Sequence, residues 1–244
     1  MSSGAMLAID ELYAAYQSGI DILQGLSLRV APNSMSLVIG PNGAGKSTLL
    51  RVVFGILKPH AGSIRFRDEP ISALDPFEVK ARGIGYVPQE INTFTHLTVE
   101  ENLRMGGWIF RRDKARLRRQ MDRVYEIFPP LAERRRTRAS SLSGGQGRML
   151  SVAREMMTEP ALMLVDEPTA GLAPNLVDQV YDLLLTARRT IGSTILLVDQ
   201  NIEQAILHAD HVYMVNLGRI KAEGPARDFP PERIAALIQE CLLG

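Results

Sequence analysis

The chain has little of what several large protein classes require. Its 244 residues contain a single cysteine, Cys241, which excludes an internal disulfide and is compatible with a reducing compartment. No uninterrupted apolar run approaches the roughly 20 residues that a membrane-spanning helix needs. Residues 1–8 lack a basic segment followed by a long apolar stretch, so they do not resemble a secretory signal. We therefore expect a chain that is soluble on its own.

A large excess of charge is also missing. Lysine and arginine number 28 against 27 aspartates and glutamates, which gives a net charge of +1 at pH 7. This balance provides no bulk attraction to nucleic acid or anionic lipid, and we expect no nucleic-acid partner. The basic runs at residues 111–119 and 134–138 are typical of a solvated helical face, and a lipid-headgroup or nucleic-acid role is the less favoured alternative.

Short apolar runs alternate with segments of helical pattern. The length fits one large α/β domain, alone or with a small helical insert. Four runs are typical of buried strands: Met35–Ile39, Ile84–Val87, Leu162–Val165 and Ile195–Val198. Alternation of such strands with helices predicts an α/β fold whose parallel sheet is covered on both sides.

Helix signals lie between and after these strands. Thr98 and Glu101 have capping-box spacing, so a helix is expected to start at Val99, and residues 99–140 look helical throughout. Pro174 suits the first position of another helix. The remaining expectations are helices at 46–54, 145–157 and 231–243, and a hairpin at 211–222.

A glycine-rich segment follows the first of these strands. It fits G-x-x-x-x-G-K-[ST] in full with Gly40, Pro41, Asn42, Gly43, Ala44, Gly45, Lys46 and Ser47, and Thr48 comes next. The glycines let successive N–H groups face a phosphate, and the following helix adds its positive end. Lys46 can reach the β and γ phosphates, and the Ser47 hydroxyl can ligate Mg²⁺. The alternative is a glycine-rich turn with an accidental lysine; the strand before it and the helix after it favour ATP and Mg²⁺.

Two carboxylates close a later buried strand. Asp166 and Glu167 follow Leu162–Val165, at the sheet edge where open α/β sheets bind ligands. Asp166 can hold the magnesium shell, and Glu167 can polarise a water for attack on the γ phosphate. A helix-capping acid pair is the alternative, which the phosphate loop makes less favoured.

A third motif precedes the acidic pair. Leu142 is followed by Ser143, Gly144, Gly145 and Gln146, which open a helix with free N–H groups. A phosphate loop, LSGGQ and an acidic strand end in this order resemble the ATP-binding subunits of ABC transporters over essentially the whole chain. The resemblance implies one domain, 1–244, with a P-loop core of mixed sheet, an antiparallel β subdomain and a helical subdomain at about 90–160. It also implies ATP hydrolysis in a head-to-tail dimer, where these signature residues cover the ATP bound at the partner's phosphate loop.

Other positions match this family one at a time. Gln89 lies where the family's glutamine reaches the magnesium and the water, and Tyr16 lies where an aromatic ring stacks on adenine, with a surface or core tyrosine as the alternative. Two positions depart from the family. Ala173 replaces an aspartate that many members have, and Gln200 replaces the switch histidine. Gln200 can donate to a γ-phosphate oxygen but cannot become cationic, so blunted sensing is expected.

The sequence is most similar to one subgroup. Residues 97–106 and 124–133, the G-L-A-P turn and the D-Q-N switch resemble the LivF type, which serves branched-chain amino acid uptake. This implies a second, LivG-like ATPase as partner in a homo- or heterodimer, two permease subunits, a periplasmic solute-binding protein, and a cytoplasmic location peripheral to the inner face of the cell membrane. Phe94 and Leu97 are equally candidates for permease contact and for local core.

Two alternative functions remain open at this point. Residues 89–94 resemble lipopolysaccharide-export ATPases, which share the chemistry and differ in membrane partner. A non-transport ABC ATPase acting on DNA or ribosomes is less favoured, because the chain has one cassette and no heptad run. The transported solute and the roles of Cys241 and Trp108 are not readable from the sequence.

Overall fold

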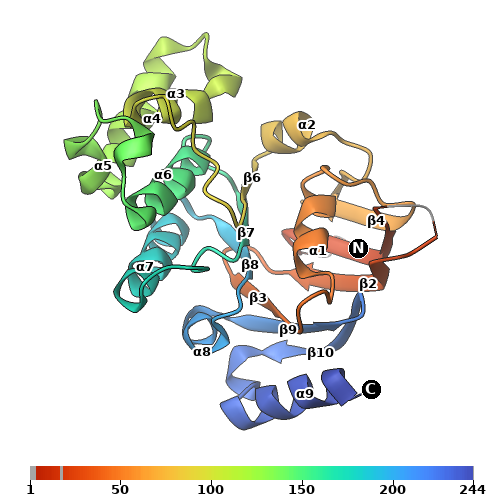
Figure 1. Ribbon diagram of the computed structural model, residues 1–244. Helices are drawn as coiled ribbons and strands as arrows, with labels where there is room; N and C mark the ends of the chain where they lie inside the picture. Colours follow the sequence, from red (N-terminus) through yellow and green to blue (C-terminus); the bar gives the residue numbers. More distant parts are fainter. Residues whose placement is uncertain (1–3, 17–18, 244) are drawn as a thin grey trace.

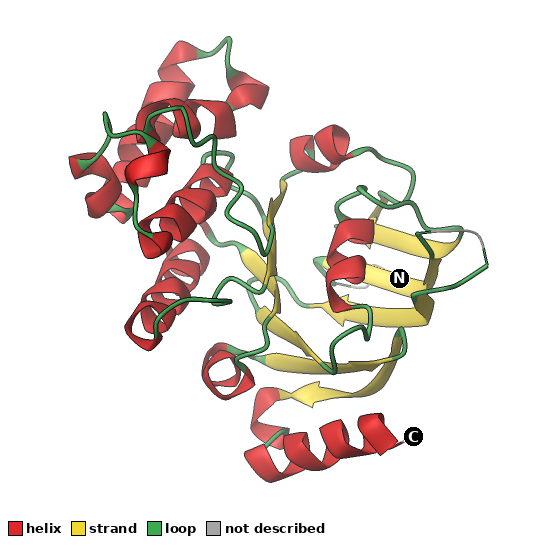
Figure 2. Ribbon diagram, viewed as in Figure 1, coloured by secondary structure: helices red, strands yellow, loops and turns green. Residues whose placement is uncertain are grey.

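The computed structural model describes residues 4–16 and 19–243, and two sheets organise them (Figures 1 and 2). The six-stranded sheet has the order β10-β9-β3-β8-β7-β6, and the four-stranded sheet has the order β2-β1-β4-β5. The strands are β1 Leu7–Ala14, β2 Leu23–Val30, β3 Met35–Ile39, β4 Ala61–Phe66, β5 Glu69–Pro70, β6 Ile84–Val87, β7 Leu162–Asp166, β8 Thr194–Val198, β9 His211–Asn216 and β10 Arg219–Pro225.

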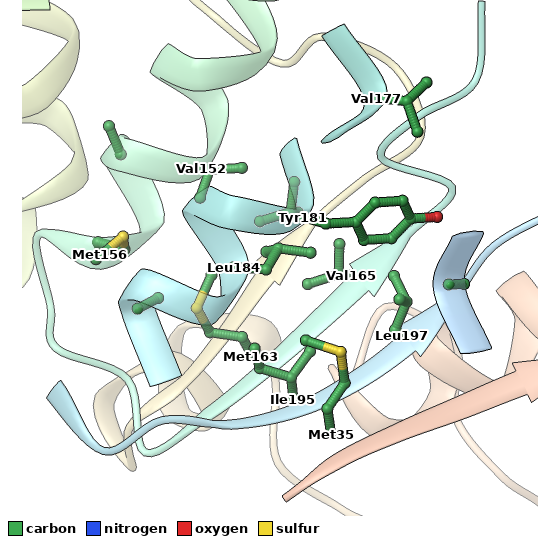
Figure 3. Close-up of a cluster of buried hydrophobic side chains, with 14 of the residues drawn as sticks. Met35, Val152, Met156, Met163, Val165, Val177, Tyr181, Leu184, Ile195 and Leu197 are labelled. Atoms are coloured by element: carbon green, nitrogen blue, oxygen red, sulfur yellow. The ribbon is translucent and has the colours of Figure 1, made fainter. Parts of the chain in front are cut away.

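The larger sheet is parallel from β9 to β6, and only the edge strand β10 runs antiparallel. Because successive side chains of a strand point to opposite faces, β3 serves two cores. Leu37 joins the cluster with α6 and α7, and Val38 joins the cluster with α1 and the smaller sheet. Figure 3 shows the first cluster, in which Tyr181 and Leu184 lie over Val165 and Leu197. The predicted parallel sheet with cover on both faces is confirmed.

Helices fill the connections. They are α1 Lys46–Val53, α2 Pro76–Ala81, α3 Val99–Gly106, α4 Lys114–Ile127, α5 Pro129–Glu133, α6 Gly144–Met156, α7 Pro174–Ile191, α8 Ile202–Ala205 and α9 Pro231–Leu243, with short 3₁₀ turns η1 Trp108–Phe110, η2 Ala139–Ser141, η3 Ile206–His208 and η4 Ala226–Asp228. Among the described helices, none is long and apolar enough to cross a bilayer.

The segment between β6 and β7 contains α3 to α6, which gather on one side of the molecule (Figure 1). Thr98 and Glu101 form the predicted capping box, and α3 starts at Val99 as expected. α3 packs closely on α6: a Cβ on Gly106 would lie 2.3 Å from the Arg154 carbonyl oxygen, so only glycine fits. Most of residues 99–140 is helical as expected, but in several separate pieces, because glycines at 106–107 and prolines at 129–130 divide the segment. The signature helix also begins one residue earlier than predicted, at Gly144.

Candidate functional site

The phosphate loop connects β3 to α1. Gly40, Gly43 and Gly45 have positive φ angles of 147°, 81° and 102°, which favour glycine. A Cβ on Gly40 would lie 2.1 Å from the Val215 carbonyl oxygen, so the first glycine is required by packing as well. The Lys46 ammonium donates to the carbonyl oxygens of Gly40 and Pro41, at 2.8 and 2.9 Å. The loop is therefore a tight turn, and the Lys46 side chain folds back over its backbone.

Lys46 is buried in this turn with 6% of its surface exposed. Burial lowers its pKa from the usual lysine value, and the negative charges of Glu167 and Asp166 oppose that shift. The ammonium donates to neutral carbonyl oxygens, and an incoming anion would add the attraction of opposite charges in a partly desolvated place. The turn fits a polyphosphate ligand.

Asp166 is the last residue of β7 and lies beside Ser47, the second residue of α1. The Ser47 hydroxyl donates to Asp166 Oδ1 at 2.8 Å, and the Tyr86 hydroxyl donates to Oδ2 at 3.4 Å. Asp166 is 1% exposed, and burial raises its pKa above the usual aspartate range, against the bond from Ser47. One hydroxyl and one carboxylate side by side fit Mg²⁺, which takes few protein oxygens and completes its shell with water and substrate phosphates.

Glu167 leaves the strand in an unusual backbone conformation, with φ at 43°. Its carboxylate accepts two side-chain amides: Gln89 Nε2 donates to Oε2 at 2.7 Å, and Gln200 Nε2 donates to Oε1 at 2.8 Å. We call Gln89 and Gln200 the amide pair. A non-glycine residue at positive φ is a strained position of the kind that clusters at functional sites. Both oxygens of the predicted base are therefore occupied in this arrangement.

Tyr16 lies at the mouth of the same pocket. Its ring is 52% exposed, and its hydroxyl accepts from Arg51 Nη1 at 3.0 Å and lies 3.5 Å from Thr48 Oγ1. Ile22, which the sequence did not indicate, lies beside it. The pocket has a volume of about 350 Å³ and is lined by Tyr16, Ile22, Asn42, Gly43, Gly45, Lys46, Ser47, Thr48, Gln89, Glu167 and Gln200.

The signature residues do not line this pocket. Ser143 caps α6, where its Oγ accepts from the Gln146 N–H at 3.3 Å and the Gln146 side chain accepts from the Ser143 N–H at 3.2 Å. Ser143 and Gly144 are exposed, and a Cβ on Gly144 would meet nothing within 4 Å. The amino end of α6 is thus open and contributes nothing to the pocket of its own chain's phosphate loop.

Two buried links behind the pocket were missed from the sequence. The Arg148 guanidinium, 3% exposed, donates to the Gln89 carbonyl oxygen and, at 2.9 Å, to that of Pro88. Burial lowers the pKa of Arg148, and Asp199 opposes the shift. Arg148 therefore fixes the backbone of Gln89 to α6. No local pattern marks it, because both partners lie about 60 positions away in the chain.

The second link joins the loop after Glu167 to the switch loop. Asp199, 2% exposed, accepts from the Thr169 hydroxyl at 2.9 Å and from the Tyr181 hydroxyl at 3.1 Å. The Asn201 N–H also donates to it at 2.9 Å. Asp199 and Asn201, the two neighbours of Gln200, are therefore both held in place by hydrogen bonds to the buried Asp199 carboxylate. Ala173 caps α7 without a side-chain bond, and His208 lies in a 3₁₀ turn with its ring 5.1 Å from that of Tyr181.

Comparison with known proteins gives concordant matches. The family model described as "ABC transporter" matches residues 23–170. The branched-chain amino acid transport ATP-binding protein BraG of Pseudomonas aeruginosa is 41% identical, over 88% of this chain and 91% of that protein. The probable branched-chain amino acid transport ATP-binding protein LivF of Archaeoglobus fulgidus is 35% identical, over 92% and 94%.

An export protein and two solved structures are also similar to this chain. The Nod factor export ATP-binding protein I of Rhizobium etli is 35% identical, over 90% of this chain and 68% of that protein. A solved ATP-binding cassette of an ABC transporter in its ADP conformation has a TM-score of 0.84 and 28% identity, over 98% of this chain and 99% of the other. A second structure, free of nucleotide, has a TM-score of 0.84 and 27% identity over the same shares.

Proposed function

Because this chain belongs to the ABC transporter family of ATP-binding proteins, we propose that it is the ATP-hydrolysing subunit of an importer of branched-chain or related amino acids. One observation carries the hydrolytic part: Lys46, Glu167 and Gln200 line a single pocket with Ser47 and Gln89. The solute class is supported by the similarity to BraG and LivF. The whole chain is proposed as one cassette, with a helical subdomain at about 90–160.

Nucleotide binding uses the loop and the lysine together. The backbone of residues 40–48 surrounds the phosphates, and the Lys46 ammonium exchanges the carbonyl oxygens of Gly40 and Pro41 for the β and γ phosphates. Tyr16 provides an exposed ring for adenine. Ser47, Asp166 and Gln89 are the proposed Mg²⁺ side chains; when bound, the ion neutralises charge that develops on the transferred phosphoryl group.

Glu167 is the proposed general base. Each of its oxygens accepts one amide hydrogen, which reduces the basicity of the carboxylate, so release by one member of the amide pair would make Glu167 a stronger acceptor for the proton of a water. Gln200 is the proposed one to leave, because it occupies the switch position, where its amide would exchange one charged acceptor, the Glu167 carboxylate, for another, a γ-phosphate oxygen. A neutral amide makes a weaker bond to phosphate than a cationic histidine, which limits the rate at this site.

The site is incomplete within one chain. The exposed amino end of α6, with Ser143, Gly144, Gly145 and Gln146, is proposed to cover ATP held by a second ABC ATPase subunit of LivG-like type, which supplies its own signature in return. Permease subunits, served by a periplasmic solute-binding protein, would hold the pair at the cytoplasmic face of the membrane.

Lipid export is the alternative. The Nod factor export protein, at 35% identity, supports export as the direction of transport, and the BraG match at 41% over a larger share of the relative favours import. Proteoliposomes that contain this chain with the permeases and second ATPase encoded beside it would decide. We expect ATP-driven accumulation of radiolabelled leucine, lost with Lys46→Ala. Lipid movement without amino acid uptake would contradict the proposal.

A further inference from the structure

A second concave site lies in the helical part of the molecule and shares no lining residue with the phosphate pocket. It has a volume of about 680 Å³, within the range of cavities that hold small ligands. α3, α4 and the segment after α5 form it, at the end of the molecule farthest from α9 (Figure 1). Its lining residues are Glu100, Arg104, Arg111, Lys114, Leu117, Arg118, Met121, Asp122, Tyr125 and Arg135.

One face of α4 makes the wall of this cavity. Residues 114, 117, 118, 121, 122 and 125 all line it, and their spacing of three and four places them along one side of a helix. Leu117 and Met121 add apolar surface to a lining that also includes Lys114, Arg118 and Tyr125. Arg111, Lys114 and Arg118 of the basic run at residues 111–119 are exposed, as a solvated face predicts, and they line this hollow.

The charges in the cavity are unequal. Five cationic side chains line it against two carboxylates, Glu100 and Asp122, an excess of three positive charges. The chain as a whole carries a net charge of only +1. Positive charge from two separate basic runs is thus concentrated at one concave place, where field lines are focused.

Two of the cationic side chains, Arg104 and Arg111, are held in position by contacts, and the backbone of a third residue, Arg135, is fixed. Arg104 pairs with Glu100 at 2.7 Å, one turn earlier on α3. The Arg111 guanidinium lies over the Trp108 ring, 4.7 Å from its centroid, and donates to the Trp108 carbonyl oxygen. The Glu100 N–H donates to the Arg135 carbonyl oxygen at 2.9 Å, which fixes the segment after α5 against α3. Less side-chain freedom is then lost when a ligand binds.

Tyr125 adds a neutral donor. Its hydroxyl is buried and has no hydrogen-bond partner among the described residues. Burial, followed by the charge of Glu100, raises the pKa of Tyr125 to about 12, so the hydroxyl stays protonated at neutral pH. A buried hydroxyl without an acceptor is unfavourable, and a shift of the Tyr125 side chain toward an oxyanion in the cavity would provide one.

We propose that this cavity binds a phosphorylated anion, with Arg104, Arg111, Lys114, Arg118 and Arg135 around its phosphates and the Tyr125 hydroxyl donating to one oxygen. Planar guanidinium groups match phosphate geometry, and the lysine adds a point charge. The inference does not depend on the hydrolytic site, since the two pockets have no residue in common.

Trp108 provides the readout, because it is the only tryptophan of the chain and stacks on Arg111. Its fluorescence is followed while inorganic tripolyphosphate is added. We expect a saturable change that persists in Lys46→Ala, which separates this cavity from the phosphate loop. The apparent affinity should fall as salt is raised, because the contacts are ionic.

A charge-reversal variant tests whether the anion binds in this cavity. Lys114→Glu with Arg118→Glu changes two exposed side chains of the wall, and we expect the affinity to fall at least about tenfold, since each charge-assisted bond is worth roughly that factor. The matched control is Arg219→Glu with Lys221→Glu on β10, which makes the same change of charge on exposed residues outside the cavity. Thermal melting of both variants verifies that they fold.

Co-sedimentation with vesicles distinguishes the two sources of such an anion. Recruitment by phosphatidic acid vesicles but not by phosphatidylcholine vesicles identifies a lipid headgroup, whereas tripolyphosphate binding without recruitment identifies a soluble ligand. The proposal is overturned if no saturable fluorescence change occurs in the folded protein, or if the β10 control weakens binding as much as the α4 variant.

Discussion

Asp166 and Glu167 are neighbours in the sequence but lie in different surroundings. Asp166 is the last residue of β7 and accepts hydroxyl donors, whereas Glu167 turns away at positive φ and accepts the amide pair. Hydroxyls can rearrange to ligate a metal alongside the carboxylate, and amide side chains can swing to a phosphate and free a base. The backbone turn between the two residues, rather than their acidity, therefore separates the proposed metal role from the proposed base role.

The largest effect is expected from Glu167→Gln. The substitution keeps the shape and removes the charge, so ATP binding should persist while hydrolysis falls by about 100-fold or more, the usual contribution of a general base. Phosphate release and nucleotide affinity are measured together. If turnover were unchanged, Glu167 would not be the general base, and the proposed difference in role between Asp166 and Glu167 would be wrong.

Asp166→Asn tests the other side of the comparison. Loss of the carboxylate next to Ser47 should raise the Mg²⁺ concentration needed for half-maximal activity by at least about 10- to 100-fold, the range found even for outer-shell partners of metals. Activity is titrated against Mg²⁺ at saturating ATP. If only the maximal rate fell and the Mg²⁺ requirement stayed the same, Asp166 would not be a ligand.

Gln200→His sharpens the role of the amide pair. A protonated histidine adds a positive charge to its bond with the anionic γ phosphate, which the neutral Gln200 amide cannot do, so we expect ATPase activity to rise by up to about tenfold. The increase should be larger at pH 6 than at pH 8, since histidine titrates between them, with an ordinary pKa of about 6.5. A fall in activity would mean that the contact of Gln200 with Glu167 matters more than its contact with phosphate.

Tyr86→Phe should have the smallest effect. Its hydroxyl lies 3.4 Å from Asp166, against 2.8 Å for Ser47, and typical hydrogen bonds contribute about 0.5–1.5 kcal/mol to stability. We expect a change in unfolding free energy of that size and less than about a twofold change in rate. Denaturant unfolding and steady-state kinetics measure both, and a large rate loss would make Tyr86 part of the metal site.

Local signals predicted the parts of the fold that depend on local geometry. The strand Ile84–Val87, the start of α3 at Val99 and the tail helix Pro231–Leu243 agree with the structure residue by residue. α2 was not predicted, although Asp75 and Glu78 form a capping box around Pro76, a signal that was present in the sequence. The breaks within 99–140 were also readable from paired glycines and prolines.

Contacts between distant segments were beyond the sequence. The phosphate loop and the acidic strand end were expected to meet, because parallel strands share an edge. The contacts of Tyr86 with Asp166 and of Thr169 with Asp199 depend instead on side-chain directions that no spacing specifies. Strand β1 could not be predicted from the sequence either. A register shift at its middle and the positive φ of Glu11 interrupt the alternation of side chains between its two faces.

The guanidinium of Arg148 links α6 to the loop that carries Gln89. The helix begins at the signature residues, and one turn later Arg148 holds the carbonyl of Gln89, whose amide rests on Glu167. To slide past each other, helix and loop would have to break both bonds from the Arg148 guanidinium. A displacement of α6 would therefore be expected to move the Gln89 loop, and with it the amide that contacts Glu167.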